Sequence, residues 1–424
     1  MYILLVVFFV VYSCFDFKKS FLTYAAFSIL LNAGIAFKYS SPAITCEFIL
    51  SLYFSILFWC KYKNKYIRRQ SGCLLKRPFL FCSISLIISS FITFYTIDSI
   101  SGFSNSIQKI ITNYLFICCF WYICRTINDI MFFSKRLLLV FVVVFVYGVF
   151  EYISNSNPVL EYIKESIPDV FAKDKIYLSD LDNLRDGRAR FQSLFSISIL
   201  YGIMSVLFCF FLIYIKQLNV FRINKWVYYS LILCSLFACY LSNSKTPVVA
   251  ISIFLIPIIL NNRFLLFVDC FLIVFIICFP DIILNVLSYF INIDAFKVKE
   301  NSLEGSSLYM RMIQLDTSIS LFLKSPIWGN GIRSAAIFSE KGYQVFGAES
   351  VWFRLMIEQG LLGLISYIYM MISLVKISLK QNRLKIPLLF YTFGFFTICS
   401  ITDINYTMFF MCFIVMYKLE FFLK

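Results

Sequence analysis

The sequence contains no histidine and few charged residues, and both features exclude classes of protein. Without histidine, the chain lacks the commonest metal ligand and the side chain that most readily exchanges protons near neutral pH. Charged residues make up 14% of the chain and hydrophobic residues 61%, whereas about a quarter of a soluble domain is charged. A soluble globular domain is therefore excluded, and we expect neither a metal nor another cofactor.

Two further patterns are missing. The 15 cysteines lie almost all in apolar segments, as Cys118 and Cys119 do, so no disulfide framework is predicted. The chain also lacks the glycine-rich lysine loop of ATP-driven pumps. Its formal charge of +15 comes from basic clusters between apolar blocks, which is a pattern of membrane topology. We therefore expect no nucleic-acid partner.

The apolar residues form blocks long enough to cross a bilayer, because about 20 helical residues span its hydrocarbon core. This pattern predicts one integral membrane domain over residues 1–424, an all-α polytopic bundle of about 11 to 13 transmembrane helices. The block at Tyr2–Phe15 is interpreted as a retained span, and the block at 264–290 contains Pro280 and Asp281, so it breaks or re-enters. The predicted spans are 2–15, 21–37, 43–60, 78–98, 108–124, 137–152, 193–215, 226–242, 247–260, 264–290, 351–375, 386–401 and 405–419.

The basic clusters predict the orientation of the spans. Segments 61–77 and 376–385 carry several lysines and arginines and no acidic residue, which is typical of cytoplasmic loops. Alternate threading then places two long polar segments, 153–192 and 291–350, on the opposite face. Their charges are balanced, with six basic and seven acidic residues in the first and six of each in the second. Two large loops on the non-cytoplasmic face are therefore predicted.

The first of these loops ends in a cluster of arginines, Arg185, Arg188 and Arg190, on the side where topology disfavours them. An arginine fork binds phosphate oxygens in pairs, so the cluster is a candidate site for a lipid-linked diphosphate. Another outer cation is Lys245, in a tight turn between two spans. The alternatives are structural: Lys245 snorkels to the interface, and the arginines pair with nearby acidic residues, namely Asp180, Asp182 and Asp186.

The second loop contains a predicted amphipathic helix that carries Arg311. Its apolar residues recur at steps of three and four, and it lies either at the membrane interface or against the bundle. Arg311 shares the opposite face with Gln314 and Ser318. The structural alternative is a surface helix with a solvated arginine. The apolar stripe consists of Leu308, Met312, Leu315, Ile319 and Phe322.

Two carboxylates lie at or near the outer mouth of the next span. Glu349 is a candidate general base, because burial at such a place raises a carboxylate pKa toward neutrality. The alternative is an ion pair of Glu349 or Glu358 with Arg354, since four-residue spacing places Arg354 and Glu358 on one helix face. For Glu358 we prefer the structural interpretation.

These residues stand in an order that resembles the O-antigen polymerase and O-antigen ligase superfamily. Residues 241–375 carry most of the resemblance, and we take this segment as the core region of the predicted enzyme. The arginine motif Arg190-Phe191-Gln192-Ser193-Leu194-Phe195 also looks like one of that superfamily. The other matching motifs are Ser242-Asn243-Ser244-Lys245-Thr246, Arg311, Lys324-Ser325-Pro326-Ile327-Trp328-Gly329-Asn330-Gly331, Ala348-Glu349-Ser350, and Ile357-Glu358-Gln359-Gly360-Leu361-Leu362-Gly363-Leu364.

The resemblance implies a membrane glycosyltransferase with a GT-C-like fold in the bacterial inner membrane, with its active site facing the periplasm. Its substrates would be undecaprenyl diphosphate-linked oligosaccharides, both donor and acceptor. By resemblance, Arg190 and Arg311 hold the donor diphosphate, with Lys245 and Arg188 beside them and Glu349 as the catalytic base. Lys245 departs from the arginine usual in the family, which keeps the charge and loses the fork.

Glu349 stands where the ligases typically carry histidine. A ligase mechanism that uses this histidine is excluded, so the resemblance favours an O-antigen polymerase of lipopolysaccharide biosynthesis. The alternatives are a ligase that transfers glycan to the lipid A core, and a lipid-linked oligosaccharide flippase or other transporter. Transporters usually carry charges near the bilayer midplane, whereas these charges cluster at the outer mouth. The expected partners are membrane lipid, a chain-length regulator and a flippase of the same pathway.

Overall fold

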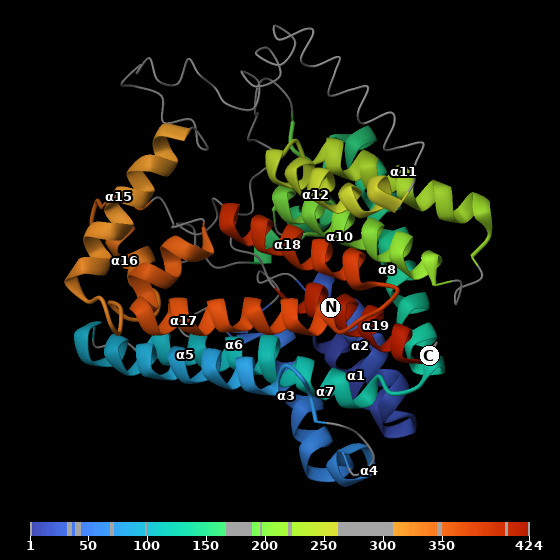
Figure 1. The fold of residues 1–424 in the computed structure, drawn as a ribbon, viewed down its shortest axis with the longest axis horizontal. Helices are drawn as coiled ribbons and strands as arrows, with labels where there is room; N and C mark the ends of the chain where they lie inside the picture. Colours follow the sequence, from blue (N-terminus) through green and yellow to red (C-terminus); the bar gives the residue numbers. More distant parts are fainter. Residues whose placement is uncertain are drawn as a thin grey trace, which may run out of the picture.

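The computed structural model describes residues 2–31, 36–38, 44–67, 72–97, 100–166, 189–195, 197–218, 223–261, 308–343, 345, 350–402 and 406–422. Within these ranges the chain is almost entirely helical (Figure 1). The elements of the first part are α1 (Tyr2–Phe15), α2 (Phe17–Phe27), the 3-10 turn η1 (Ser28–Leu30), β1 (Ala36–Lys38), β2 (Ile44–Thr45), α3 (Cys46–Leu57), the π-helix η2 (Phe58–Tyr62), α4 (Lys63–Ile67), α5 (Lys76–Ile97), α6 (Ile100–Lys109), the π-helix η3 (Ile110–Leu115) and α7 (Phe116–Ile123). They are followed by α8 (Ile127–Ser154), α9 (Pro158–Ser166), α10 (Ser198–Gln217), α11 (Lys225–Leu241), α12 (Lys245–Asn261), α15 (Leu308–Lys324), α16 (Ser334–Glu340), α17 (Val351–Leu379), α18 (Lys385–Ile401) and α19 (Thr407–Phe422).

The predicted helical membrane bundle is confirmed. Helices α8, α10 and α17 and most of α5 are long and apolar enough to cross a bilayer, and α1, α11, α12 and α18 are shorter apolar helices. Large apolar side chains also cover the outside, for example Phe91, Val146 and Leu233, each more than half exposed. An apolar exterior of this extent is suited to lipid rather than water.

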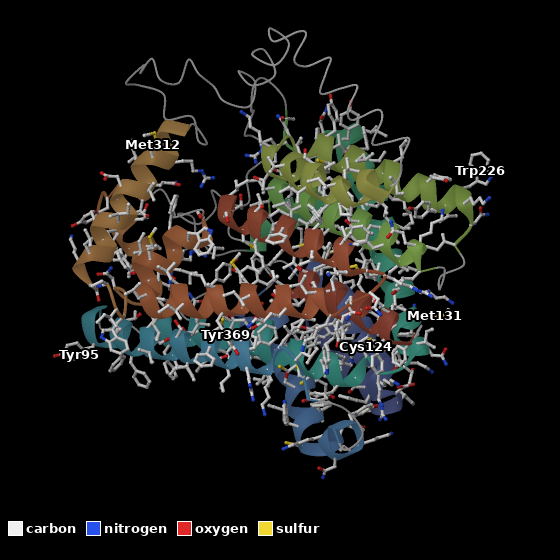
Figure 2. All side chains as sticks on the ribbon, viewed as in Figure 1. Tyr95, Cys124, Met131, Trp226, Met312 and Tyr369 are labelled. Atoms are coloured by element: carbon white, nitrogen blue, oxygen red, sulfur yellow. The ribbon has the colours of Figure 1, made fainter. Side chains whose placement is uncertain are left out.

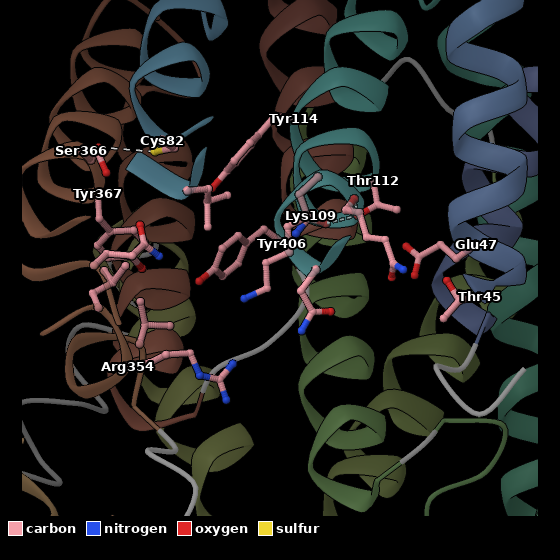
Figure 3. Close-up of a pocket in the computed structure, with 17 residues that line it drawn as sticks. Thr45, Glu47, Cys82, Lys109, Thr112, Tyr114, Arg354, Ser366, Tyr367 and Tyr406 are labelled. Carbon is pink, nitrogen blue, oxygen red and sulfur yellow. Dashed lines mark hydrogen bonds between the residues drawn. The ribbon is translucent and has the colours of Figure 1, made fainter. Parts of the chain in front are cut away.

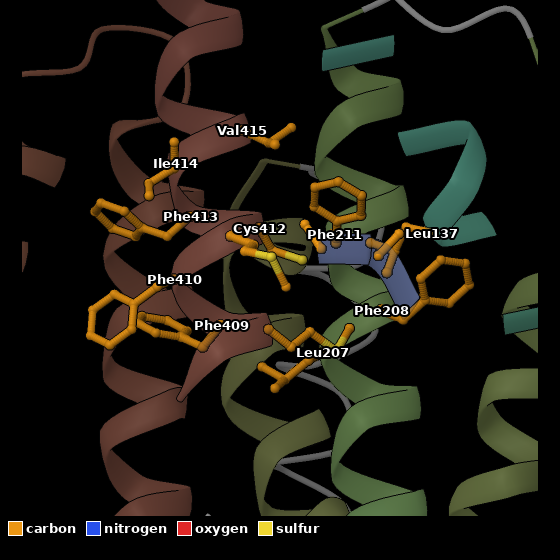
Figure 4. Close-up of a cluster of buried hydrophobic side chains, with 14 of the residues drawn as sticks. Leu137, Leu207, Phe208, Phe211, Phe409, Phe410, Cys412, Phe413, Ile414 and Val415 are labelled. Carbon is orange, nitrogen blue, oxygen red and sulfur yellow. The ribbon is translucent and has the colours of Figure 1, made fainter. Parts of the chain in front are cut away.

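Helix α19 forms the centre of the core (Figure 4). Its residues from Met408 to Met416 are all buried, as expected for a helix that is apolar on every side. Phe409 stacks on Phe395 of α18, with ring centroids 3.7 Å apart, and Phe208 of α10 stacks on Phe141 of α8 at 4.0 Å. In a bilayer such close packing replaces the hydrophobic effect as the force between helices.

The structure differs from the predicted spans at several places. The span predicted at 137–152 begins earlier, because α8 begins at Ile127. The span predicted at 21–37 is shorter, because α2 and η1 end at Leu30 and the chain then pairs β1 with β2 in a short antiparallel ladder. The span predicted at 108–124 begins earlier, because α6, η3 and α7 continue one another from Ile100. The span predicted at 264–290 lies outside the described residues.

Several segments that were predicted to be cytoplasmic contact one another through polar side chains, and they lie at one end of the bundle. Lys18 forms an ion pair with Asp129, with 2.6 Å between Nζ and Oδ1. The buried Lys418 donates to the carbonyls of Trp121 and Cys124. Glu420 accepts the backbone N–H groups of the turn before α18, from Asn382, Arg383 and Leu384.

The opposite end of the bundle carries the second predicted loop. In Figure 2, Trp226, Met131 and Cys124 lie toward one side of the molecule, and Tyr95 and Met312 lie toward the other. The separation of the two sets of helix ends agrees with the threading. Which end faces the cytoplasm stays a prediction.

Candidate functional site

Residues 190–195, the arginine loop, are held by a buried carboxylate at the end of α8. Glu151 is 0% exposed and accepts the backbone N–H groups of Ser193 (2.6 Å) and Gln192 (3.2 Å). It also accepts a hydrogen bond from Asn157 Nδ2 at 2.9 Å. A buried charge is tolerated only with such partners. Glu151 therefore fixes the backbone next to Arg190.

Glu151 was not predicted as a site residue. The sequence does contain an indication of its importance, because an ionisable residue inside a long apolar helix marks a functional or structural site. Its partners Gln192 and Ser193 lie some forty residues further along the chain, and no local pattern connects them. The role of Glu151 follows only from the fold.

Residues 242–246, the lysine turn, lie directly beside the arginine loop. The N–H of Phe191 donates to the carbonyl of Leu241, at 3.1 Å. On the other side of the turn, the hydroxyl of Thr246 lies 3.5 Å from that of Thr402, which follows α18. The structure thus brings the segments of Arg190 and Lys245 together at one end of α10, α12 and α18.

Helix α15 presents Arg311 from the side that faces the protein. Arg311 is partly buried, its Nη1 donates to Gln314 Oε1 at 3.3 Å, and Gln314 and Ser318 are 1% and 0% exposed. The apolar residues Met312 and Ile319 are instead 56% and 42% exposed. Arg311 is therefore only partly accessible to solvent. Helix α15 packs against α17, and its exposed apolar residues remain available to the membrane interface.

Residues 326–331, the docked turn, fill a break in helix α17. Gly360 has φ 61° and ψ −151°, a conformation open essentially to glycine alone, and it interrupts the helical hydrogen bonds. The docked turn supplies replacement partners, as a broken membrane helix requires. The bonds run from Asn330 N to Ile357 O (2.8 Å), from Gly331 N to Glu358 O (3.1 Å), from Leu361 N to Pro326 O (2.8 Å) and from Leu362 N to Ile327 O (3.2 Å).

Two glycines permit this close approach. A Cβ on Gly329, whose φ is +76°, would lie 2.4 Å from the backbone nitrogen of Gln359. A Cβ on Gly360 would lie 2.6 Å from the backbone nitrogen of Gly329. Two motifs that were separate in the sequence resemblance are therefore one structural unit.

Glu358 belongs to this unit. Its side chain is 5% exposed, and Oε1 accepts the backbone N–H of Arg333 at 3.0 Å. Arg333 has φ +68°, which is uncommon for a residue with a side chain. The contact shows that Glu358 holds the chain after the docked turn, while its predicted ion pair with Arg354 stays a prediction.

A cavity of about 380 Å³ lies between α3, α5, α6, η3 and α17 (Figure 3). Two cationic side chains line it, Lys109 and Arg354, together with amides, hydroxyls and several apolar groups. Glu47 lines the cavity as well, and in Figure 3 it lies away from Arg354, with Tyr406 and Lys109 between them. The other lining residues are Thr45, Cys82, Leu86, Asn105, Gln108, Thr112, Asn113, Tyr114, Val351, Leu355, Gln359, Ser366 and Tyr367.

The π-helix η3 supplies three of these lining residues. Thr112, Asn113 and Tyr114 all belong to η3 and line the cavity, and Asn113 Oδ1 accepts a hydrogen bond from Thr407 of α19 at 3.2 Å. Short π segments are rare and frequently occur at functional sites. Lys109 is the last residue of α6, so it lies about 14 Å along the helix axis from Ile100, where α6 begins. No role was predicted for Lys109 from the sequence, because the predicted span 108–124 begins next to it.

Two of the predicted site residues, Glu349 and Arg188, lie outside the described residues. So do Arg185, Asp180, Asp182 and Asp186, and with them the alternative of arginine–aspartate pairing. Within the ranges given above, no three His, Cys, Asp or Glu side chains gather as metal ligands. Four described cations concern the site: Arg190 and Lys245 lie around the lysine turn, and Lys109 and Arg354 line the cavity. Arg311 lies on α15, which packs against α17.

Residues 194–368 match the family model described as O-antigen ligase. This segment contains the lysine turn, Arg311, the docked turn and the break in α17. The resemblance to the O-antigen polymerase and ligase superfamily is thus confirmed over this segment. The family comprises membrane glycosyltransferase-like enzymes that act on lipid-linked oligosaccharides. No curated protein matches the chain.

Proposed function

We propose that the protein is an O-antigen polymerase that joins undecaprenyl diphosphate-linked oligosaccharide repeats at the periplasmic face of the inner membrane. The observation that carries the proposal is the match over residues 194–368 in a chain without histidine. The match supports glycosyl transfer between lipid-linked substrates. The missing histidine disfavours the ligase, whose expected histidine position is occupied here by Glu349.

The proposed donor site uses the cations at the end of the bundle opposite Trp226. Arg190 and Lys245 lie on neighbouring segments there, and Arg311 faces inward from α15, while Arg188 is an additional candidate. Cationic hydrogen-bond donors of this kind bind a diphosphate and stabilise the negative charge that develops when the diphosphate leaves. Phe191 and Leu241 tie the first two segments together, which supports a preorganised site.

The reaction transfers the growing glycan from one lipid to the terminal sugar of another. The acceptor hydroxyl oxygen forms a bond to the anomeric carbon of the donor, and the bond from this carbon to the diphosphate oxygen breaks. Undecaprenyl diphosphate leaves with the electron pair, held by the cations. The hydroxyl proton passes to a base, for which Glu349 is the candidate.

The surface glycan of a deletion strain tests the proposal. A polymerase defect leaves the lipid A core capped with a single repeat unit, because ligation continues without chain growth. A ligase defect instead leaves the core without any repeat and strands polymer on undecaprenyl diphosphate. A strain with normal polymer lengths would reject both functions.

A further inference from the structure

The proposed reaction has two lipid-linked substrates, and each carries a diphosphate. The cations around the lysine turn and Arg311 account for the donor, whose diphosphate leaves. The acceptor keeps its diphosphate throughout, and that group also needs a cationic site near the bilayer surface. The inference below therefore rests on the proposed function.

The cavity between α5, α6, η3 and α17 has the composition that such a site needs. Lys109 and Arg354 line it from two different helices, and positive side chains within a membrane bundle mark substrate sites by default. Glu47 lies away from Arg354 with Lys109 between them (Figure 3), so an anion is favoured on the Arg354 side. A volume of about 380 Å³ is within the usual range for ligand sites, roughly 300 to 1,000 Å³.

The cavity also lies next to the proposed donor site. Tyr406, just before α19, lines the cavity, and Thr402, at the end of α18, contacts Thr246 of the lysine turn. Thr402 and Tyr406 are only four residues apart in the chain, so the lysine turn and the cavity lie close together. An acceptor sugar bound at the cavity can meet the anomeric carbon bound beside the lysine turn.

Neutral side chains in the cavity suit the sugar part of the acceptor. Asn113 is held by Thr407, and Gln359 accepts a hydrogen bond from Ser85 at 2.7 Å. Amides fixed in this way retain other donors for hydroxyl groups. Val351 and Leu355 line the same cavity and offer apolar surface to the lipid chain.

We propose that this cavity binds the diphosphate of the acceptor, with Lys109 and Arg354 as its cationic ligands. The enzyme thus has two diphosphate sites, one beside the lysine turn and one in the cavity. The site at the lysine turn stabilises a leaving group, and the cavity only positions a group that does not react.

Binding of undecaprenyl diphosphate to the purified full-length chain tests the proposal by native mass spectrometry. We expect two bound lipids for the wild type and one for Lys109→Gln/Arg354→Gln. Each single variant should weaken the second binding step roughly 10- to 100-fold, because hydrogen bonds to charged groups contribute that much. The matched control Arg77→Gln/Lys341→Gln removes the same two charges at exposed positions and should still bind two lipids.

The inference is overturned if the wild type binds one lipid, or if the double variant binds two as tightly as the wild type. Should the double variant not fold, the single variant Lys109→Gln decides by the same criterion. A transfer assay separates this result from the proposed function. Two bound lipids without chain growth would reject the polymerase and keep the site. Chain growth with an unchanged acceptor KM in Lys109→Gln and in Arg354→Gln would reject the site and keep the polymerase.

Discussion

At the scale of single residues, Arg190 owes its position to Glu151. The carboxylate is buried and accepts hydrogen bonds from the backbone N–H groups of Gln192 and Ser193. These hydrogen bonds fix the backbone conformation of the loop after Arg190. The sequence indicated Arg190 as a candidate, because the residue is predicted to lie on the side of the membrane where arginine is disfavoured. It could not indicate the carboxylate that holds it, because this pairing depends on how α8 and α10 pack.

We expect Arg190→Ala and Arg311→Ala to abolish polymer formation while the protein stays folded in the membrane. A clamp on a diphosphate leaving group acts through paired, charge-assisted hydrogen bonds, and losing one such donor lowers the rate by roughly 10² to 10³. Arg→Lys should rescue only partly, because lysine lacks the fork. Polymer length in cells and transfer rate in a purified assay are the measurements.

Arg136→Ala is the control, because this arginine lies near the predicted cytoplasmic start of α8 and should leave polymer formation unchanged. Normal polymer in both Arg190→Ala and Arg311→Ala would eliminate the clamp. Loss of folded protein, seen as aggregation in detergent, would instead assign these arginines a structural role.

Glu349 is tested as the base by two substitutions. Glu349→Gln keeps the shape of the side chain and loses the proton acceptor, so donor binding should survive and transfer should fall by roughly 10² to 10⁴. Glu349→His supplies another base near neutral pH and should retain partial activity. Normal transfer in the glutamine variant would remove Glu349 from the mechanism.

At the scale of elements, hydropathy predicted most helices well, because apolar blocks about as long as the bilayer is thick have few other structures open to them. It did not predict the break at Gly360, since a glycine within an apolar block is compatible with a continuous helix. The π-helix η3 was missed for a similar reason. Its residues Ile110–Leu115 differ from an ordinary helix only in which backbone groups pair.

The inward orientation of Arg311 could not be predicted from the sequence either. The spacing of the apolar residues in α15 predicts one polar and one apolar face, but it does not predict which face packs against the protein. Here the polar face packs inward, because Gln314 and Ser318 are buried and the apolar stripe is left to the membrane interface. A rule learned from soluble proteins gives the opposite orientation.

The break in α17 makes a prediction about stability. Gly360→Ala should lower the melting temperature of the detergent-solubilised protein, because the backbone strain costs about 1 to 3 kcal/mol and the new Cβ meets the docked turn at 2.6 Å. Gly342→Ala is a matched control. Gly342 shares a positive φ of +85°, yet nothing lies within 4 Å of its Cβ position.

Gly342→Ala therefore incurs the backbone cost alone, and its melting temperature should fall less than that of Gly360→Ala. Equal losses in the two variants would contradict close contact between the docked turn and α17. Gly329→Ala should behave like Gly360→Ala, since its Cβ would lie 2.4 Å from the backbone of Gln359.

At the scale of the whole molecule, the orientation in the membrane can be tested with reporters. A reporter that is active only in the periplasm should work when fused after residue 170 or 330 and be silent after residue 70 or 380. The reason is that the basic clusters agree on one side. The contacts of Lys18 with Asp129 and of Glu420 with Arg383 also place those segments at one end. Swapped signals would overturn the orientation and with it the periplasmic site.

The docked turn has a consequence for how the chain is made. Residues 326–331 leave the ribosome before residues 357–363, so the partner of the broken helix already exists when α17 enters the membrane. An apolar helix with unpaired backbone groups would otherwise face lipid during insertion, at a cost of several kcal/mol per group. A nascent chain with the docked turn deleted would therefore insert α17 poorly, and the quality control of the cell would degrade it before any sugar is transferred.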